Sequence, residues 1–165
     1  MKGLIKFLFL FLFFFSTLWG EAFLQGDFLT VKNSESLWEL IGNVSLQNQK
    51  YHLKSQKMHY YRKLKKIIAQ GEVRVSLLEE NKNIEGFFFE KEGKTQIFRG
   101  EPVRVTENNG EKQTLANTLK VQEKNKEKIF IFLGQVKVIE KESIISAEKL
   151  TYHDQEKKAF LEDNA

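Results

Sequence analysis

A chain of 165 residues with 41% hydrophobic and 29% charged side chains can form one folded domain, so its composition excludes disorder as the main state. It contains no cysteine, which excludes disulfides, thiolate metal sites, thiol catalysis and lipid attachment through a cysteine. The net charge of +4 falls to about +2 without Lys2 and Lys6, too little for the basic surface of a nucleic-acid binder, so we expect no nucleic-acid partner.

Residues 1–20 have the features of a secretory signal peptide. Two lysines precede an apolar run over residues 7–19, and the small residues Gly20 and Ala22 place cleavage near positions 20 to 22. The run is thirteen residues long, shorter than the ~20 that cross a bilayer as a helix. An uncleaved membrane anchor is the alternative. Either interpretation exports the rest of the chain, which we expect to form a single domain over residues 23–165.

The stretch Gly71-Glu72-Val73-Arg74-Val75 returns along the chain. Near-copies begin at Gly42, Gly100 and Gly134, so successive glycines are 29, 29 and 34 residues apart. A period of 20 to 50 residues is typical of stacked architectures in which each unit contacts its neighbours. We therefore predict an elongated protein built from repeated units of about 29 residues.

A second landmark precedes each repeated glycine by 16 residues, or by 18 in the last complete copy. The landmarks start at Gly26, Ser55, Ile84, Ala116 and Ala147. The copy at Ile84-Glu85-Gly86 is poor, which leaves the register of that unit open. The glycine expected after the fifth landmark is replaced by Asp163, so the last unit reads as an unfinished strand or a cap.

Apolar residues alternate within the units, as in Phe87 and Phe89 or Leu119 and Val121, and a period of two predicts β-strands. Leu53 falls out of this phase. Glycine inside a strand commonly marks a bulge or bend, so each repeated glycine is predicted to kink a long strand between two sheets. About three strands fit in each unit. We expect an all-β fold, an elongated antiparallel β-jellyroll or sandwich that is open along one side if its sheets splay.

Three local features are interpreted in the light of the repeat. Residues 111–128 could form a charged helix by propensity, but their place in the repeat predicts strand. Pro102 is an extra residue relative to the other copies, and its missing N–H predicts a bulge or an edge. Asn109-Gly110 predicts a hairpin turn.

The repeated motifs resemble those of the OstA-like domain, the periplasmic domain of the lipopolysaccharide transport protein LptA that is shared with LptC and the N-terminal part of LptD. The resemblance is carried by Gly42-Asn43-Val44-Ser45-Leu46, by Gly71-Glu72-Val73-Arg74-Val75 and by the landmark Ala147-Glu148-Lys149-Leu150-Thr151-Tyr152. It extends over residues 23–165. It implies an open β-jellyroll in the periplasm that stacks head to tail with related domains and bridges the inner and outer membranes.

The resemblance also implies a ligand, lipopolysaccharide or a related glycolipid, whose lipid A acyl chains lie in the apolar interior. The implied partners are LptC-like and LptD-like domains bound through the end strands, or further copies of the chain. An LptC-like role, anchored in the inner membrane and facing the periplasm, is an alternative. The implied lipid-binding residues are Val44, Leu46, Met58, Tyr60, Val73, Val75, Phe87, Phe89, Val103, Leu119, Val121, Val136, Val138 and Leu150.

The remaining motifs favour neither an enzyme nor a cofactor or metal site. The three histidines, His52, His59 and His153, follow no metal-ligand spacing, and no nucleophile or phosphate-loop motif is present. A basic cluster over residues 62–66 could meet lipid phosphates but is more typical of a solvated hairpin loop. A purely structural β-repeat protein with a closed core is the hypothesis that competes with a lipid carrier.

Overall fold

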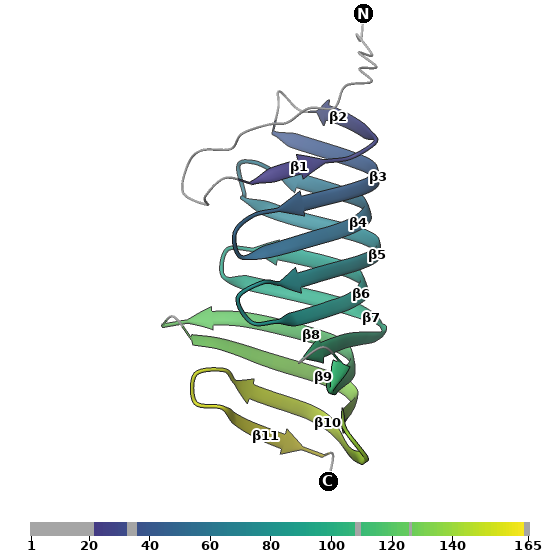
Figure 1. Cartoon of the computed structure of the whole chain (residues 1–165). Coiled ribbons are helices and arrows are strands. Elements are labelled where there is room, and N and C mark those ends of the chain that lie inside the picture. The colour runs from purple at the N-terminus through teal and green to yellow at the C-terminus, as the bar shows by residue number, and fades with distance from the viewer. Residues whose placement is uncertain (1–21, 33–35, 108–109, 126, 164–165) are drawn as a thin grey trace, which may run out of the picture.

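The computed structural model describes residues 22–32, 36–107, 110–125 and 127–163, which form one antiparallel sheet of eleven strands. The strands are β1 (Phe23–Gln25), β2 (Phe28–Lys32), β3 (Leu37–Gln47), β4 (Tyr51–Tyr61), β5 (Lys66–Leu77), β6 (Lys82–Glu92), β7 (Thr95–Glu107), β8 (Lys112–Lys124), β9 (Glu127–Glu140), β10 (Ser143–His153) and β11 (Lys158–Glu162). They stack in chain order along one axis (Figure 1). The predicted signal peptide and the alternative anchor lie outside the described residues.

Each long strand bends near its middle, so the sheet folds into two faces. β1 and β2 show this most simply, because β1 pairs with the end of β3 and β2 pairs with its beginning. We call the half of the sheet that continues β1 the β1 face, and the half that continues β2 the β2 face. The line of bends is the corner. The mouth is the opposite side, where most of the hairpin turns of the two faces lie (Figure 1).

The corner is built on glycines with left-handed backbone. Gly42, Gly71 and Gly134 have φ values of +77°, +75° and +75°, and the residue after each also has a positive φ. Glycine adopts this conformation without the steric cost of a Cβ. The predicted kink at the repeated glycine is therefore confirmed at these three bends. The fourth bend uses the longer insertion Gly100-Glu101-Pro102, which interrupts the pairing of β7 with β8 and confirms the bulge predicted at Pro102.

Odd and even strands bend in different ways. β5 inserts two residues at the corner, Gly71 and Glu72, whereas its partner β6 inserts one, Phe87. Two inserted residues preserve the alternation of side chains, and one inserted residue reverses it. The reversal on the even strands explains why Leu53 is out of phase with Met58 although both are buried.

The buried residues form a single core between the faces. Its largest fully buried side chains include Phe89, Phe98, Phe130, Leu53 and Met58. Burying one such side chain stabilises the fold by roughly 1.5–3 kcal/mol. The core therefore holds the two faces together along most of the length of the sheet.

The predicted fold class is confirmed, since the chain forms an elongated antiparallel sheet whose described strands run linearly from β1 to β11 without closing. Residues 112–124 are strand rather than helix, and β7 and β8 form the hairpin predicted near Gly110. The expectation of three strands per unit is wrong. Each unit contains two long strands, such as β4 and β5, because the segments before and after a glycine are halves of one bent strand.

Gly71→Ala tests the contribution of the corner. An added Cβ would lie 2.4 Å from Oε1 and 3.0 Å from Cβ of Gln56, at a φ of +75°. We expect the free energy of unfolding, measured in urea, to fall by about 1–3 kcal/mol, because of the left-handed backbone and the displaced glutamine. Gly93→Ala is the control, since Gly93 has a φ of +56° and nothing within 4 Å of the added Cβ. Equal losses in both variants would show that the close approach at the corner is unimportant.

Val73→Asp tests the inward assignment of the β1 face. Val73 is completely buried in the core, so the aspartate would carry an unpaired charge away from water. We expect a loss of about 3–5 kcal/mol or more in unfolding free energy, or no folded protein, by circular dichroism. Lys54→Asp, at an exposed position on the neighbouring strand, should fold normally. A Val73→Asp protein as stable as the control would contradict the assignment.

Candidate functional site

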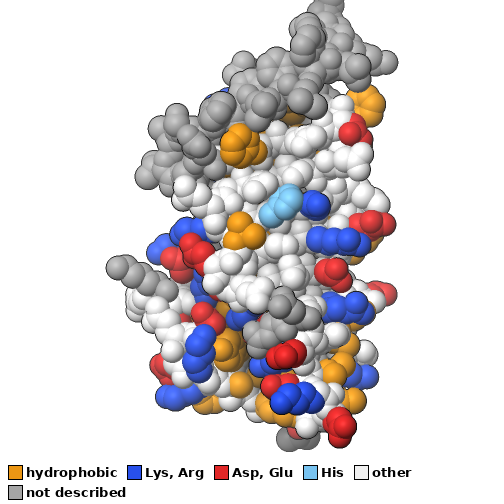
Figure 2. Space-filling view, in the orientation of Figure 1, with side chains coloured by type: hydrophobic (Ala, Val, Ile, Leu, Met, Phe, Trp, Pro, Cys, Tyr) orange, Lys and Arg blue, Asp and Glu red, His pale blue; other side chains and the backbone are white. Residues whose placement is uncertain are grey.

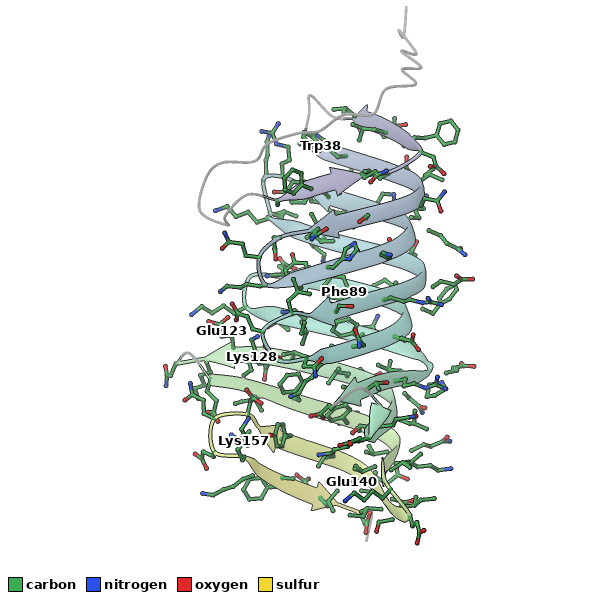
Figure 3. The ribbon with its side chains drawn as sticks, viewed as in Figure 1. Trp38, Phe89, Glu123, Lys128, Glu140 and Lys157 are labelled. Atoms are coloured by element: carbon green, nitrogen blue, oxygen red, sulfur yellow. The ribbon has the colours of Figure 1, made fainter. Side chains whose placement is uncertain are left out.

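The inward side chains of the two faces form an apolar row along the length of the sheet, which we call the apolar track. Eleven of the predicted interior residues are buried in it, and Tyr60 and Val138 are partly buried against it. The buried ones are Val44, Leu46, Met58, Val73, Val75, Phe89, Val103, Leu119, Val121, Val136 and Leu150. Figure 3 shows Trp38 and Phe89 labelled in this row. The inward orientation of these residues is therefore confirmed, and their role in lipid binding stays a prediction.

Phe87 is the exception, and its predicted interior position is wrong. Its side chain is 67% exposed, because Phe87 is the single residue that β6 inserts at the corner. The alternation reverses at that point, so Phe89 is buried while Phe87 points outward. Gln56 and Asn117 occupy the same corner position on β4 and β8, where they lie close to Gly71 and Gly134.

Phe87 and Phe88 line a hollow on the outside of the corner, with a volume of about 1280 Å³. Arg99 and Pro102 also line it, and the guanidinium carbon of Arg99 lies 5.2 Å from the centre of the Phe88 ring. Because this hollow lies on the outer surface, it is not part of the apolar track.

Several large residues of the apolar track were missing from the predicted set. Phe98, Phe130 and Phe132 are buried on the β2 face, and the rings of Phe89 and Phe98 are 4.8 Å apart. All three precede a repeated glycine on an odd strand. They lie two or four residues before the glycine, so the alternation of a strand, followed backwards from each repeated glycine, would have identified them as inward residues.

The apolar track is exposed at both ends of the sheet. At the N-terminal end, the β2 residues Leu29 and Val31 pair with buried Leu40 and Trp38 but are themselves 40% and 47% exposed. At the C-terminal end, Ile145 pairs with Val138 and is 49% exposed. Leu161 on β11 is 48% exposed beside buried Leu150. Inward apolar side chains thus remain uncovered where the stack of strands ends.

The two edges of the sheet differ. β1 and β2 together cover both halves of β3, so both faces are complete at the N-terminal end. β11 pairs only with residues 149–153 of β10, on the β2 face. Within the described part of the chain, residues 143–147 of β10 pair on one side only, with β9. The β1 face therefore offers an open strand edge at the C-terminal end.

A lysine projects into the apolar track from the β1 face. Lys82, the first residue of β6, is buried, with its Nζ atom 4.4 Å from the ring centre of Phe130 and 5.2 Å from that of Tyr152 on the β2 face. The same Nζ lies 3.4 Å from Oδ1 of Asp154, in the turn after β10, and 3.9 Å from Oε2 of Glu107, on the adjacent strand. Burial raises the pKa of the Asp154 carboxyl, but the charges of Lys82 and Lys157 outweigh it and hold the pKa below its usual value.

A second ion pair crosses the mouth beside the first. Lys128 at the start of β9 donates from Nζ to Oε1 of Glu80, in the turn between β5 and β6. Figure 3 shows Lys128 labelled near the mouth. Glu80 belongs to the β1 face and Lys128 to the β2 face, so this pair, like Lys82 with Asp154, joins the two faces. Sequence analysis had placed none of these four residues in a site.

The outer surface carries ion pairs within each face. On the β2 face, the Glu39 carboxylate lies 2.7 Å from Nζ of Lys32, 2.8 Å from Nζ of Lys57 and 3.0 Å from Nε2 of His59. Hydrogen bonds from these groups, led by Lys32, hold the pKa of Glu39 far below its usual value. Figure 2 shows acidic and basic side chains interspersed over the visible face.

The histidines and the basic cluster have structural partners. His59 contacts Glu39, His153 contacts Glu127 at 3.1 Å, and within the described ranges no group of three or more His, Asp or Glu residues could hold a metal ion. Residues 62–65 form the exposed turn between β4 and β5. Lys66 pairs with Glu90 at 2.6 Å across the β2 face, which raises the pKa of its ammonium.

No helix in the described residues is long and apolar enough to cross a membrane. Among solved structures, the crystal structure of LptH aligns with 88% of this chain and 84% of its own, at 12% identity and a TM-score of 0.42. LptH is described as the LptA homologous periplasmic component of the conserved lipopolysaccharide transport device from Pseudomonas aeruginosa. The comparison with curated proteins found no match.

Residues 24–158 match the family described as "LptA/(LptD N-terminal domain) LPS transport protein". The match extends over most of the chain and includes every long strand and every bend of the corner. The chain therefore belongs to the LptA/LptD N-terminal domain family of lipopolysaccharide transport proteins.

Proposed function

We propose that this protein is a periplasmic carrier of lipopolysaccharide that holds the lipid A acyl chains in the apolar track. The observation that carries the proposal is the continuity of the track, which runs inside the sheet and ends in uncovered apolar side chains at both ends. An acyl chain is favoured in such a row for the same reason as a core side chain, at roughly 25 cal/mol per Å² of apolar surface removed from water. The sugars of the lipid would remain in water at the mouth.

The protein would act as one element of a head-to-tail bridge between the inner and outer membranes. A partner domain of the same fold can add its end strand to the open edge of β10 by main-chain hydrogen bonding. It would also cover Ile145 and Leu161, whose exposure has no structural benefit in a free monomer. The partners proposed for the two ends are LptC-like and LptD-like domains, or further copies of this chain.

The lipid-binding role predicts contact between lipopolysaccharide and the inward side of β6. A photoreactive amino acid at Phe89 should crosslink to added lipopolysaccharide, because Phe89 lies in the apolar track. The same probe at Phe87 is a matched control, since Phe87 is the same residue type on the same strand but points outward. Crosslinking is read by gel mobility and antibody detection of the lipid. Equal yields at the two positions would refute a ligand in the track and favour the closed-core structural protein.

The bridge predicts association that depends on the ends of the track. Size-exclusion chromatography over a concentration series should show growth into oligomers. Ile145→Lys should suppress that growth, because it places a charge where the track of a second copy would continue. Ile144→Lys is the matched control on the opposite side of the same strand, where the side chain is also exposed. A monomer at every concentration, or equal effects of the two substitutions, would contradict end-to-end continuation of the track.

A further inference from the structure

We propose that the ion pairs Lys82–Asp154 and Lys128–Glu80 form an ionic gate across the apolar track. The gate separates the middle of the track from its C-terminal end and must open before a lipid can pass. This inference rests on the proposed lipid-carrying function, because it assigns a means of control to the same interior.

The Lys82 side chain extends the gate from the mouth into the apolar track. Its side chain starts on β6 of the β1 face and ends among rings of β9 and β10 on the β2 face. Lys82 is 7% exposed and its partner Asp154 is 25% exposed, so most of this pair is removed from water. An acyl chain that follows the inward row past β6 meets this side chain.

The second ion pair holds the faces together at the same level. Glu80 lies two residues before Lys82, and Lys128 lies two residues before Phe130, so the two pairs are neighbours along both faces. The Glu80 and Lys128 side chains are 14% and 31% exposed. Ion pairs shielded from water to this degree are screened less by salt than fully exposed ones.

The core makes opening necessary for the proposed ligand. Leu53, Phe98 and Leu119 are completely buried in the closed molecule. A ligand can contact such side chains only after the faces move apart at the mouth. The strands continue through the corner, so the faces can part at the mouth if the two ion pairs break and the core side chains separate, with no strand disrupted.

Glu107 gives Lys82 a carboxylate partner that does not depend on the closed arrangement. It pairs in register with Lys82 on the adjacent strand of the same face, and its Oε2 lies 3.9 Å from Nζ of Lys82. When the faces part, Lys82 loses Asp154 but retains a carboxylate on its own face. Lys82 therefore has two paired arrangements, one across the track and one along the β1 face, and such a two-state element can be biased by a ligand.

The first test measures opening without lipid. Val121→Cys places a reporter in the track of a chain that has no other cysteine, at a position only 4% exposed. Adding Glu80→Gln and Asp154→Asn removes both ion pairs and should accelerate its reaction with a maleimide by at least about tenfold, the factor that corresponds to the loss of one such partly buried pair. Glu90→Gln, which removes an ion pair on the outside of the β2 face, should leave the rate unchanged.

A second reporter separates gate opening from general destabilisation. Leu53→Cys lies in the core near the N-terminal end, away from the two ion pairs. If the gate exists, Glu80→Gln with Asp154→Asn should accelerate maleimide labelling of a cysteine at position 121 but not of a cysteine at position 53. Unchanged labelling at 121, or equal acceleration at both positions, would overturn the gate.

The third test connects the gate to transport. Glu80→Cys and Lys128→Cys joined by a reducible bis-thiol crosslinker should abolish uptake of fluorescent lipopolysaccharide, and reduction should restore it. The matched control is Lys66→Cys with Glu90→Cys, which joins two strands within the β2 face. Full uptake by the crosslinked protein would overturn the gate and leave the carrier function intact. If the wild-type chain takes up no lipopolysaccharide, the carrier function fails, while the labelling tests still decide whether the gate exists.

Discussion

The bend at the corner is the constraint on which the rest of the structure depends. β3, β5 and β9 turn through left-handed glycine backbone with two inserted residues, β7 turns with the three residues Gly100-Glu101-Pro102, and the even strands β4, β6 and β8 turn with one. This difference sets the phase of every inward row, since one inserted residue moves all later side chains of the strand to the other side. The buried pair Leu53 and Met58 has the right phase only because Gln56 is inserted between them in the pairing of β4 with β3. The residues that form the apolar track are thus determined by the insertions at the corner as well as by the hydrophobic pattern of the sequence.

Much of the fold could be predicted from the sequence because its repeat is regular. The glycine spacing revealed the units, and alternation on the odd strands identified inward residues such as Val73 and Val75. The error at Phe87 has a physical cause: the sequence does not mark the single inserted residue, and Phe87 and Phe89 alternate as if the strand were straight. The buried position of Lys82 could not be predicted for another reason. Lys82 lies in a polar stretch that resembles a loop, and its partner Asp154 is 72 residues away in the sequence.

The interior must satisfy two opposed requirements. A folded monomer needs its apolar side chains buried, and the core around Phe89 and Leu119 meets that need without any ligand. A lipid carrier needs the same side chains to become accessible. In the proposed gate, charged groups at the mouth reconcile the two, because an ion pair between the faces stabilises the closed arrangement while the strands persist when it breaks. If the protein carries lipid as proposed, apolar residues in place of Lys82 and Asp154 would stabilise the closed core and hinder lipid entry.

The ends of the sheet follow a related logic. Exposed apolar side chains and open strand edges invite unspecific aggregation, and charged residues on an edge restrain it. The end strands of the β2 face carry such charges on their outer side: Lys32 of β2 pairs with Glu39, and Glu162 of β11 pairs with Lys149. The uncovered apolar residues Val31 and Leu161 point inward instead. A partner strand that continues the inward row would cover these residues, and a register shifted by one residue would instead place its apolar side chains on the outer side, beside the ion pairs and the exposed Phe28 and Phe160.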